Sequence, residues 1–131
     1  MIYLVDTSAW VLALRADGDP KVAGEVSAAI ESNQAATCPV VLLELLSGVK
    51  TERHYQELES ELRALRFIPV EDATWTAAYR IGFTLRKKGV SSPAADILIA
   101  AAALETNCIV LHRDRHFDLM AKYTGLKTKK V

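Results

Sequence analysis

Short apolar runs alternate along the chain with longer segments in which apolar positions recur at helical spacing. The runs typical of strands buried in a parallel sheet are residues 2–5, 35–38, 67–70 and 108–111, with an edge strand at 126–128. The helices predicted around them cover residues 9–14, 20–30, 40–49, 52–65, 72–88, 93–106 and 117–122. This alternation predicts an α/β fold, a three-layer α/β/α sandwich around a small, mostly parallel central sheet.

The helix predicted over residues 72–88 has a clear beginning, end and apolar face. Asp72 is its predicted cap, and Gly89 terminates it. Its apolar face includes Trp75, Tyr79 and Phe83, which follow one another at intervals of four.

The composition is that of a folded domain, since half of the 131 residues are apolar and 24% are charged. This balance excludes intrinsic disorder, and the length fits a single domain over residues 1–131. No apolar run approaches the ~20 residues of a membrane span. Residues 1–5 lack the basic leader of a secretory signal. Cys38 and Cys108 are expected to be buried, reduced thiols, so we expect a cytoplasmic protein.

Sixteen Lys and Arg residues balance sixteen Asp and Glu residues, but the charges are unevenly distributed. Residues 1–65 hold five basic and ten acidic residues, net −5, and residues 66–131 hold eleven basic and six acidic residues, net +5. Within the basic half, residues 86–88, Arg113 and Arg115 are candidates to contact nucleic-acid phosphates. Solvated helix ends and, for Arg113, pairing with Asp118 remain open as alternatives.

Three carboxylates interrupt segments that the pattern places in the core. Asp6 follows the first strand, Glu44 is the only charge in residues 39–49, and Asp96 is the only charge in residues 93–104. A helix that is apolar on nearly every face is enclosed by protein, so we expect these carboxylates to be enclosed too. A buried carboxylate must be neutralised, paired or bound to a cation.

A divalent cation is the partner that the sequence favours for these acids. Basic residues are scarce around them, because the first fifty residues contain only Arg15, Lys21 and Lys50. The crevice of a parallel sheet lies at the carboxyl ends of its strands, where Asp114 also follows the last long strand. Oxygen ligands select Mg²⁺ or Mn²⁺, and a water bound to such an ion can attack a phosphodiester.

Residues beside the first acid are candidates for supporting roles, although each also has a structural interpretation. The hydroxyls of Thr7 and Ser8 could orient Asp6 or a metal-bound water, or Asp6 could simply cap the helix that they begin. Asp96 lies in the first turn of its helix, where the helix dipole by itself favours an acid.

The segment after the last long strand contains further candidates. Asp114 and Asp118 could both be ordinary surface acids when each is considered alone. His112 and His116 are four positions apart, but no third ligand completes a zinc-protease pattern, so we interpret both as loop residues.

With these residues in place, the sequence resembles the PIN-domain ribonucleases, and among them the VapC toxins of bacterial and archaeal toxin–antitoxin modules. The segments that carry the resemblance are residues 3–8 (Tyr-Leu-Val-Asp-Thr-Ser), 42–45 (Leu-Leu-Glu-Leu), 96–101 (Asp-Ile-Leu-Ile-Ala-Ala) and 111–117 (Leu-His-Arg-Asp-Arg-His-Phe). They occur in the family's order and span essentially the whole chain, which implies one PIN domain over residues 1–131.

The resemblance implies a Mg²⁺- or Mn²⁺-dependent endoribonuclease that is the toxin of a type II toxin–antitoxin module. Carried over residue by residue, its four acids are Asp6, Glu44, Asp96 and Asp114, serving as metal ligands and catalytic residues. The last family motif often reads Asp-x-Asp-Phe, whereas here its second acid is His116, so Asp118 is the substitute for the fourth acid. The resemblance also implies a homodimer and a VapB-type antitoxin whose tail covers the acidic crevice.

Two other functions are compatible with an acid after the first strand. A phosphoacceptor receiver domain has similar length, but it needs an acceptor Asp after a central strand and a late Lys in the crevice, and neither is evident. A non-catalytic module that binds RNA or protein would use the acids only to hold a structural cation.

Overall fold

The computed structural model describes residues 1–131 and contains five strands in one sheet, all paired in parallel. The strands are β1 (Tyr3–Val5), β2 (Ala35–Thr37), β3 (Arg66–Phe67), β4 (Ile109–His112) and β5 (Lys127–Lys130). Their order in the sheet is β3-β2-β1-β4-β5, so β1 lies at the centre between β2 and β4. The register pairs Tyr3 with Ala35 on one side and with Ile109 on the other.

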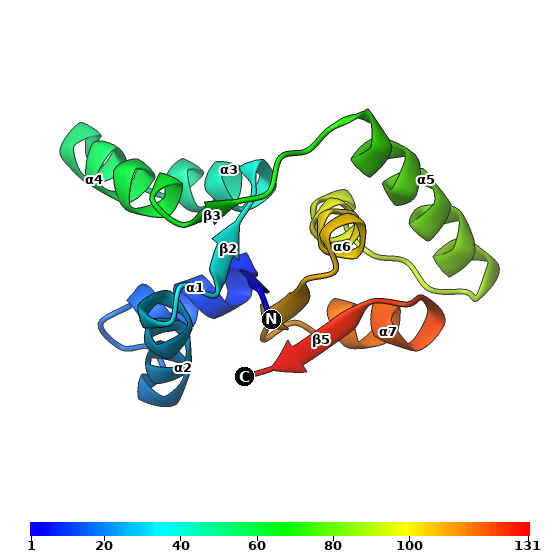
Figure 1. The fold of residues 1–131 in the computed structure, drawn as a ribbon, viewed down its shortest axis with the longest axis horizontal. Coiled ribbons are helices and arrows are strands. Elements are labelled where there is room, and N and C mark those ends of the chain that lie inside the picture. The colour runs from blue at the N-terminus through cyan, green and yellow to red at the C-terminus, as the bar shows by residue number, and fades with distance from the viewer.

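Helices cover both faces of this sheet. They are α1 (Thr7–Leu14), α2 (Pro20–Glu31), α3 (Pro39–Ser47), α4 (Glu52–Arg63), α5 (Asp72–Lys87), α6 (Ala94–Thr106) and α7 (Arg115–Tyr123). In Figure 1, α1 and α2 lie on one side of the sheet and α5, α6 and α7 on the other. The predicted three-layer α/β sandwich is therefore confirmed. No helix is both long enough and apolar enough to cross a bilayer.

The two edge strands differ from their predicted extents. The strand predicted over residues 67–70 covers only Arg66–Phe67, both exposed, because Pro69 has no N–H to donate to a ladder. At the opposite edge β5 is a regular strand that carries Lys127, Lys129 and Lys130. Charged side chains on an edge strand prevent further strands from adding to the sheet.

The core is one cluster of buried apolar residues that extends over both faces of the sheet. Leu4, Val5 and Val110 on the central strands are completely buried. The same holds for residues 99–103 of α6, four of which are alanines, so this helix is enclosed as its sequence predicts. Cys38 and Cys108 are buried and unpaired, which confirms the expectation of free thiols.

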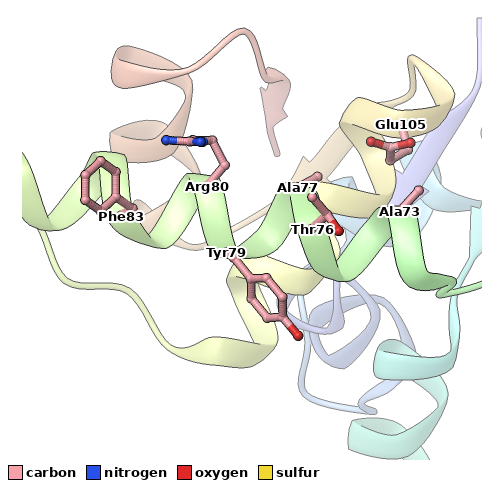
Figure 2. Close-up of a pocket in the computed structure, with 7 residues that line it drawn as sticks. All are labelled: Ala73, Thr76, Ala77, Tyr79, Arg80, Phe83 and Glu105. Atoms are coloured by element: carbon pink, nitrogen blue, oxygen red, sulfur yellow. The ribbon is translucent and has the colours of Figure 1, made fainter.

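Helix α5 packs with a different face from the one predicted. Ala78, Ile81 and Leu85 are buried on its inner side, whereas Trp75, Tyr79 and Phe83 are 44%, 68% and 53% exposed. We attribute this to helix α6, against which α5 packs with its aliphatic side chains Ala78, Ile81 and Leu85. Figure 2 shows Tyr79 and Phe83 projecting from α5.

The two ends of α5 are only partly as predicted. Asp72 is its first helical residue, and the cap is Glu71, whose N–H donates to the Thr74 hydroxyl at 3.1 Å. Gly89 ends the helix in the left-handed region, with φ of +73°, as predicted.

Candidate active site

The candidate site lies at the carboxyl ends of β1 and β4, the two central strands that neighbour one another. Asp6 directly follows β1, and Asp114 follows β4 after one intervening residue. From β1, the strands that come next in the sequence, β2 and β3, lie on one side of β1 in the sheet, and β4 and β5 lie on the other side. The strand order therefore reverses between β1 and β4. Crevices at such points are where open α/β sheets bind their ligands.

Asp6 is buried, at 2% exposure, and it caps helix α1. Its Oδ2 accepts hydrogen bonds from the Ser8 N–H at 3.0 Å and the Ser8 hydroxyl at 2.5 Å. The Ser8 hydroxyl in turn accepts a bond from the Arg113 N–H at 2.9 Å, which connects the loop after β4 to α1. Burial raises the pKa of Asp6 and the charge of Glu44 adds to this, although the bonds from Ser8 oppose it.

Glu44 is exposed, contrary to the expectation that its helix encloses it. Although α3 is apolar on nearly every face, only Val41 and Leu42 are buried, and Leu43 is 67% exposed. The Thr7 hydroxyl donates to Glu44 Oε1 at 2.7 Å and so holds the carboxylate at the end of α1 that Asp6 caps. The predicted supporting roles thus divide: Ser8 orients Asp6, and Thr7 orients Glu44.

Asp96 is buried in the first turn of α6, at 8% exposure. Its pKa is raised to about 7, first because the side chain is buried and then because the negative charges of Asp114 and Asp6 lie close to it. Its ion-pair partner is a histidine, His116, and no Lys or Arg contacts it. The expected shortage of internal cations is therefore found at this acid.

Asp114 caps helix α7 beside Asp96. Its Oδ1 accepts bonds from the His116 N–H at 2.9 Å and lies 2.8 Å from the His116 ring nitrogen Nδ1. Burial alone would raise the pKa of Asp114, but the hydrogen bonds and the charge of His116 lower it. Asp118 lies elsewhere: its Oδ1 is 3.5 Å from His112 Nε2, and its Oδ2 is 3.9 Å from Lys130 Nζ. The geometry therefore favours Asp114 as the fourth acid.

The interpretation of His112 and His116 as loop residues is wrong. His112 is the last residue of β4 and is completely buried, and its Nδ1 accepts a bond from the Asp114 N–H at 3.1 Å. His116 is the second residue of α7, and its Nδ1 lies 3.3 Å from Asp96 Oδ2. The departure of position 116 from the Asp-x-Asp-Phe pattern is the sequence signal for His116, because it puts a histidine where the family motif often has its second acid.

The tightest group of potential metal ligands comprises Asp96, Asp114 and His116, whose ligand atoms all lie within 4.8 Å of one another. Asp6 and Glu44 lie outside this group, yet both charges raise the pKa of Asp96. Asp6 Oδ1 is buried without any hydrogen-bond partner. A buried acceptor of this kind, beside acids that repel one another, fits a divalent cation with oxygen ligands.

The predicted phosphate-binding residues differ in their surroundings. Arg113 forms an ion pair with Asp19 at 3.3 Å, and not with Asp118 as the alternative had it. Arg115 is exposed at the start of α7, next to His116. Residues 86–88 form an exposed basic end of α5.

The chain is thus a parallel α/β protein with a cluster of carboxylates over the switch point of its sheet, the place where such sheets bind their ligands. The family profile of the PIN domain matches residues 3–123. Ribonuclease VapC18 of Mycobacterium tuberculosis is 38% identical over 133 residues, which cover 98% of this chain and 94% of the relative. Ribonuclease VapC11 of the same species is 34% identical, with 95% of each chain covered. The chain belongs to the PIN-domain family and, within it, to the VapC ribonucleases.

Solved structures agree with this fold. VapBC2 from Rickettsia felis, bound to a DNA fragment from its promoter, superposes with a TM-score of 0.81 at 21% identity, covering 100% of this chain and 99% of that one. DNA-bound VapBC from Salmonella typhimurium gives 0.80 at 16% identity, with 99% and 98% covered. The family membership supports the nuclease interpretation and not the phosphoacceptor receiver alternative.

Proposed function

We propose that this chain is a Mg²⁺- or Mn²⁺-dependent endoribonuclease that hydrolyses RNA phosphodiester bonds as the toxin of a type II toxin–antitoxin module. The observation that carries the proposal is the burial of Asp96 among three other acids without a Lys or Arg partner. Such a cluster is stable in its ionised form only when a cation offsets the charge. The names of its VapC ribonuclease relatives support RNA as the substrate.

In this proposal Asp6 and Asp96 are the principal metal ligands, and Glu44 and Asp114 complete the site or orient the attacking water. Ser8 occupies Oδ2 of Asp6 and leaves Oδ1 free for the ion. Asp114 is fixed in a similar way, because its Oδ1 accepts a hydrogen bond from the His116 N–H at the start of α7. A bound divalent ion would neutralise charge on the phosphate and lower the pKa of a water molecule for in-line attack.

The RNA backbone would approach over Arg115, which is exposed and can exchange a counterion for a phosphate. Residues 86–88 are the other predicted contact, but the pairing of α5 proposed below uses their charge instead. Arg113 contributes only if its ion pair with Asp19 opens, because its guanidinium is already engaged.

The test is incubation of RNA with the protein in Mg²⁺ or Mn²⁺, followed by the same reaction in EDTA. We expect chelator-sensitive cleavage that Asp96→Ala abolishes with the fold retained by circular dichroism. Asp17→Ala is the matched control, since Asp17 is an exposed acid on a loop. Full activity of Asp96→Ala would refute the mechanism, and RNA binding without scission would favour the non-catalytic module.

We also propose that the protein is a homodimer that pairs through α5. Trp75, Tyr79 and Phe83 form an exposed aromatic stripe along this helix. A hollow of about 920 Å³ lies beside the stripe, lined in part by the small residues Ala73 and Ala77 (Figure 2). Aromatic side chains next to a hollow with small residues are self-complementary across a two-fold axis.

The charges on α5 support the same antiparallel pairing. Glu71 and Asp72 lie at its N-terminal end, and residues 86–88 form a basic C-terminal end. When two copies of the helix lie antiparallel, the acidic end of each faces the basic end of the other. A second copy is therefore the occupant that we propose for the stripe.

A VapB-type antitoxin is the proposed regulatory partner. A groove of about 540 Å³ between α1, α3 and α4 begins at Thr7 and Glu44 and continues past Leu14 and Val49. Its apolar part suits the apolar side chains of a peptide, and its acidic end suits a basic side chain. The VapBC complexes among similar structures support this assignment. Leu14→Asp should retain RNA cleavage and lose inhibition by the antitoxin, whereas undiminished inhibition would place the partner elsewhere.

We infer that the protein acts in the cytosol. Both cysteines are free and buried, which suits a compartment where thiols stay reduced. The proposed substrate, RNA, is also most abundant there.

A further inference from the structure

His116 occupies the position at which the family motif often has its second acid, and it lies inside the acidic site rather than beside it. We propose that its imidazole supplies a nitrogen ligand to the metal, so that this chain has a mixed nitrogen–oxygen site that prefers Mn²⁺ to Mg²⁺. The inference rests on the metal dependence proposed above, and it assigns the metal preference to one side chain of this chain.

The distances support a ligand position for the ring. Nδ1 of His116 lies 2.8 Å from Asp114 Oδ1 and 3.3 Å from Asp96 Oδ2. Adjacent ligands of an octahedral ion with bonds of about 2.1 Å are about 3 Å apart. The ring nitrogen therefore already lies from each of the two carboxylates at about the separation of neighbouring ligands around one ion.

The backbone holds His116 in this position. It is the second residue of α7, where its N–H donates to Asp114 Oδ1 at 2.9 Å. The next residue, Phe117, is completely buried and anchors the helix in the core. Because the backbone bond to Asp114 persists without the ring, the ring nitrogen can leave Asp114 for an ion while the carboxylate remains oriented.

A second observation points independently to an ion here. Oδ1 of Asp6, a side chain that is 2% exposed, has no hydrogen-bond partner, and Asp6 lies close enough to raise the pKa of Asp96. A buried carboxylate oxygen normally accepts a hydrogen bond, and no group of the protein donates one to this oxygen. A cation near Asp96 would compensate the charge of Asp6 as well as that of the acids that repel one another.

The chemistry of the donor atoms determines the preference. Mg²⁺ takes oxygen ligands almost exclusively and gives up its waters reluctantly. Imidazole suits the transition metals, and Mn²⁺, although it is the weakest-binding ion of that series, accepts a nitrogen ligand more readily than Mg²⁺ does. Replacing a carboxylate by a neutral imidazole also removes one negative charge, which weakens Mg²⁺ binding more than Mn²⁺ binding.

The experiment detects the nitrogen directly. Full-length protein is prepared with ¹⁵N-labelled histidine and with natural histidine, loaded with Mn²⁺ without RNA, and examined by electron spin echo envelope modulation. We expect a nitrogen coupling that changes with the isotope and is absent in His116→Asp. His54→Asn is the matched control, because His54 is exposed on α4 and does not belong to the group of Asp96, Asp114 and His116, so its removal should leave the coupling unchanged.

Calorimetric titration of the same proteins with Mg²⁺ and Mn²⁺ supplies the second readout. We expect the ratio of the Mg²⁺ Kd to the Mn²⁺ Kd to fall about tenfold in His116→Asp and to stay unchanged in His54→Asn. Bound Mn²⁺ without a nitrogen coupling in the wild type would overturn the inference, and His116 would then only hydrogen-bond Asp114. If that protein still cut RNA in a metal-dependent reaction, the proposed function would survive the failure.

Discussion

The Thr7 hydroxyl donates a hydrogen bond to Glu44 Oε1 at 2.7 Å and so connects two residues that are 37 positions apart. Thr7 begins α1 directly after the buried Asp6, and Glu44 lies on an exposed part of α3. Burial does not constrain the Glu44 carboxylate, so this hydrogen bond determines where it points. One turn of backbone after β1 thus orients two of the four proposed acids.

Replacing Thr7 by Val tests this arrangement, because Val keeps the shape of Thr and lacks its hydroxyl. We expect RNA cleavage to fall about tenfold, as is usual when a residue that orients a metal ligand is lost. The free energy of unfolding should change little, since Thr7 is only half-buried. Thr7→Ser is the control and should retain activity. Equal rates for Thr7→Val and the wild type would show that the bond is irrelevant to catalysis.

The raised pKa of Asp96 predicts how stability depends on pH in the absence of metal. An unfolded Asp titrates near its ordinary value of 3.8, whereas Asp96 in the folded protein titrates at about 7. Between these values the folded state binds more protons, so the free energy of unfolding falls as pH rises, by up to about 1.4 kcal/mol per pH unit. The lowered pKa of Asp114 acts only at pH values below this window.

Urea denaturation in EDTA at several pH values between 4 and 7 measures this slope. Asp96→Asn should reduce this slope to what the raised pKa of Asp6 contributes, and should be more stable than the wild type at pH 7.5, because the charge repelled by Asp114 and Asp6 is gone. Equal slopes for the two proteins would mean that Asp96 titrates normally.

The α5 interface predicts that a charge on the aromatic stripe separates the two copies. Tyr79 is 68% exposed, so Tyr79→Glu should fold normally and yield monomers in sedimentation analysis where the wild type is dimeric. Tyr55→Glu on α4, where Tyr55 is 38% exposed, is the control and should leave the dimer intact. A monomeric wild type at micromolar concentration, or a dimeric Tyr79→Glu, would contradict the proposed pairing.

Replacing two glycines by alanine should change the free energy of unfolding in opposite directions, because one ends a helix and the other lies inside one. A Cβ atom meets no other atom within 4 Å at either Gly89 or Gly24, but only Gly89 has a positive φ, at +73°. Gly89→Ala should therefore lower the free energy of unfolding by about 1 kcal/mol. Gly24→Ala, inside α2, should raise it by about 0.5–1 kcal/mol. Changes of the same sign would contradict this assignment of the two backbone conformations.

The order of strands and helices could be predicted from the sequence because it depends on local chemistry. Hydrophobic periodicity separates strands from helices, Pro20 begins α2, and Gly89 ends α5. The burial of Asp6 and Asp96 also followed from the apolar segments around them, because each segment has no polar face to present to water.

Other features depend on which elements meet, and no local pattern contains that information. Tyr79 and its neighbours form the apolar face of α5 by composition, yet the face that packs inward against α6 is the aliphatic one that contains Ile81 and Leu85. Glu44 is exposed because nothing covers its side of α3, however apolar that helix is.

The sequence by itself therefore determined the α/β class, the order of the elements and the acids that are costly to bury. Only the tertiary structure decided that His116 joins Asp96 and Asp114 while Asp118 lies apart. Asp96 lies in α6 and Asp114 caps α7, so their distance depends on how α6 and α7 pack on the sheet. Secondary structure is set by interactions over a few residues, whereas a binding site is set by contacts between segments that only the folded chain brings together.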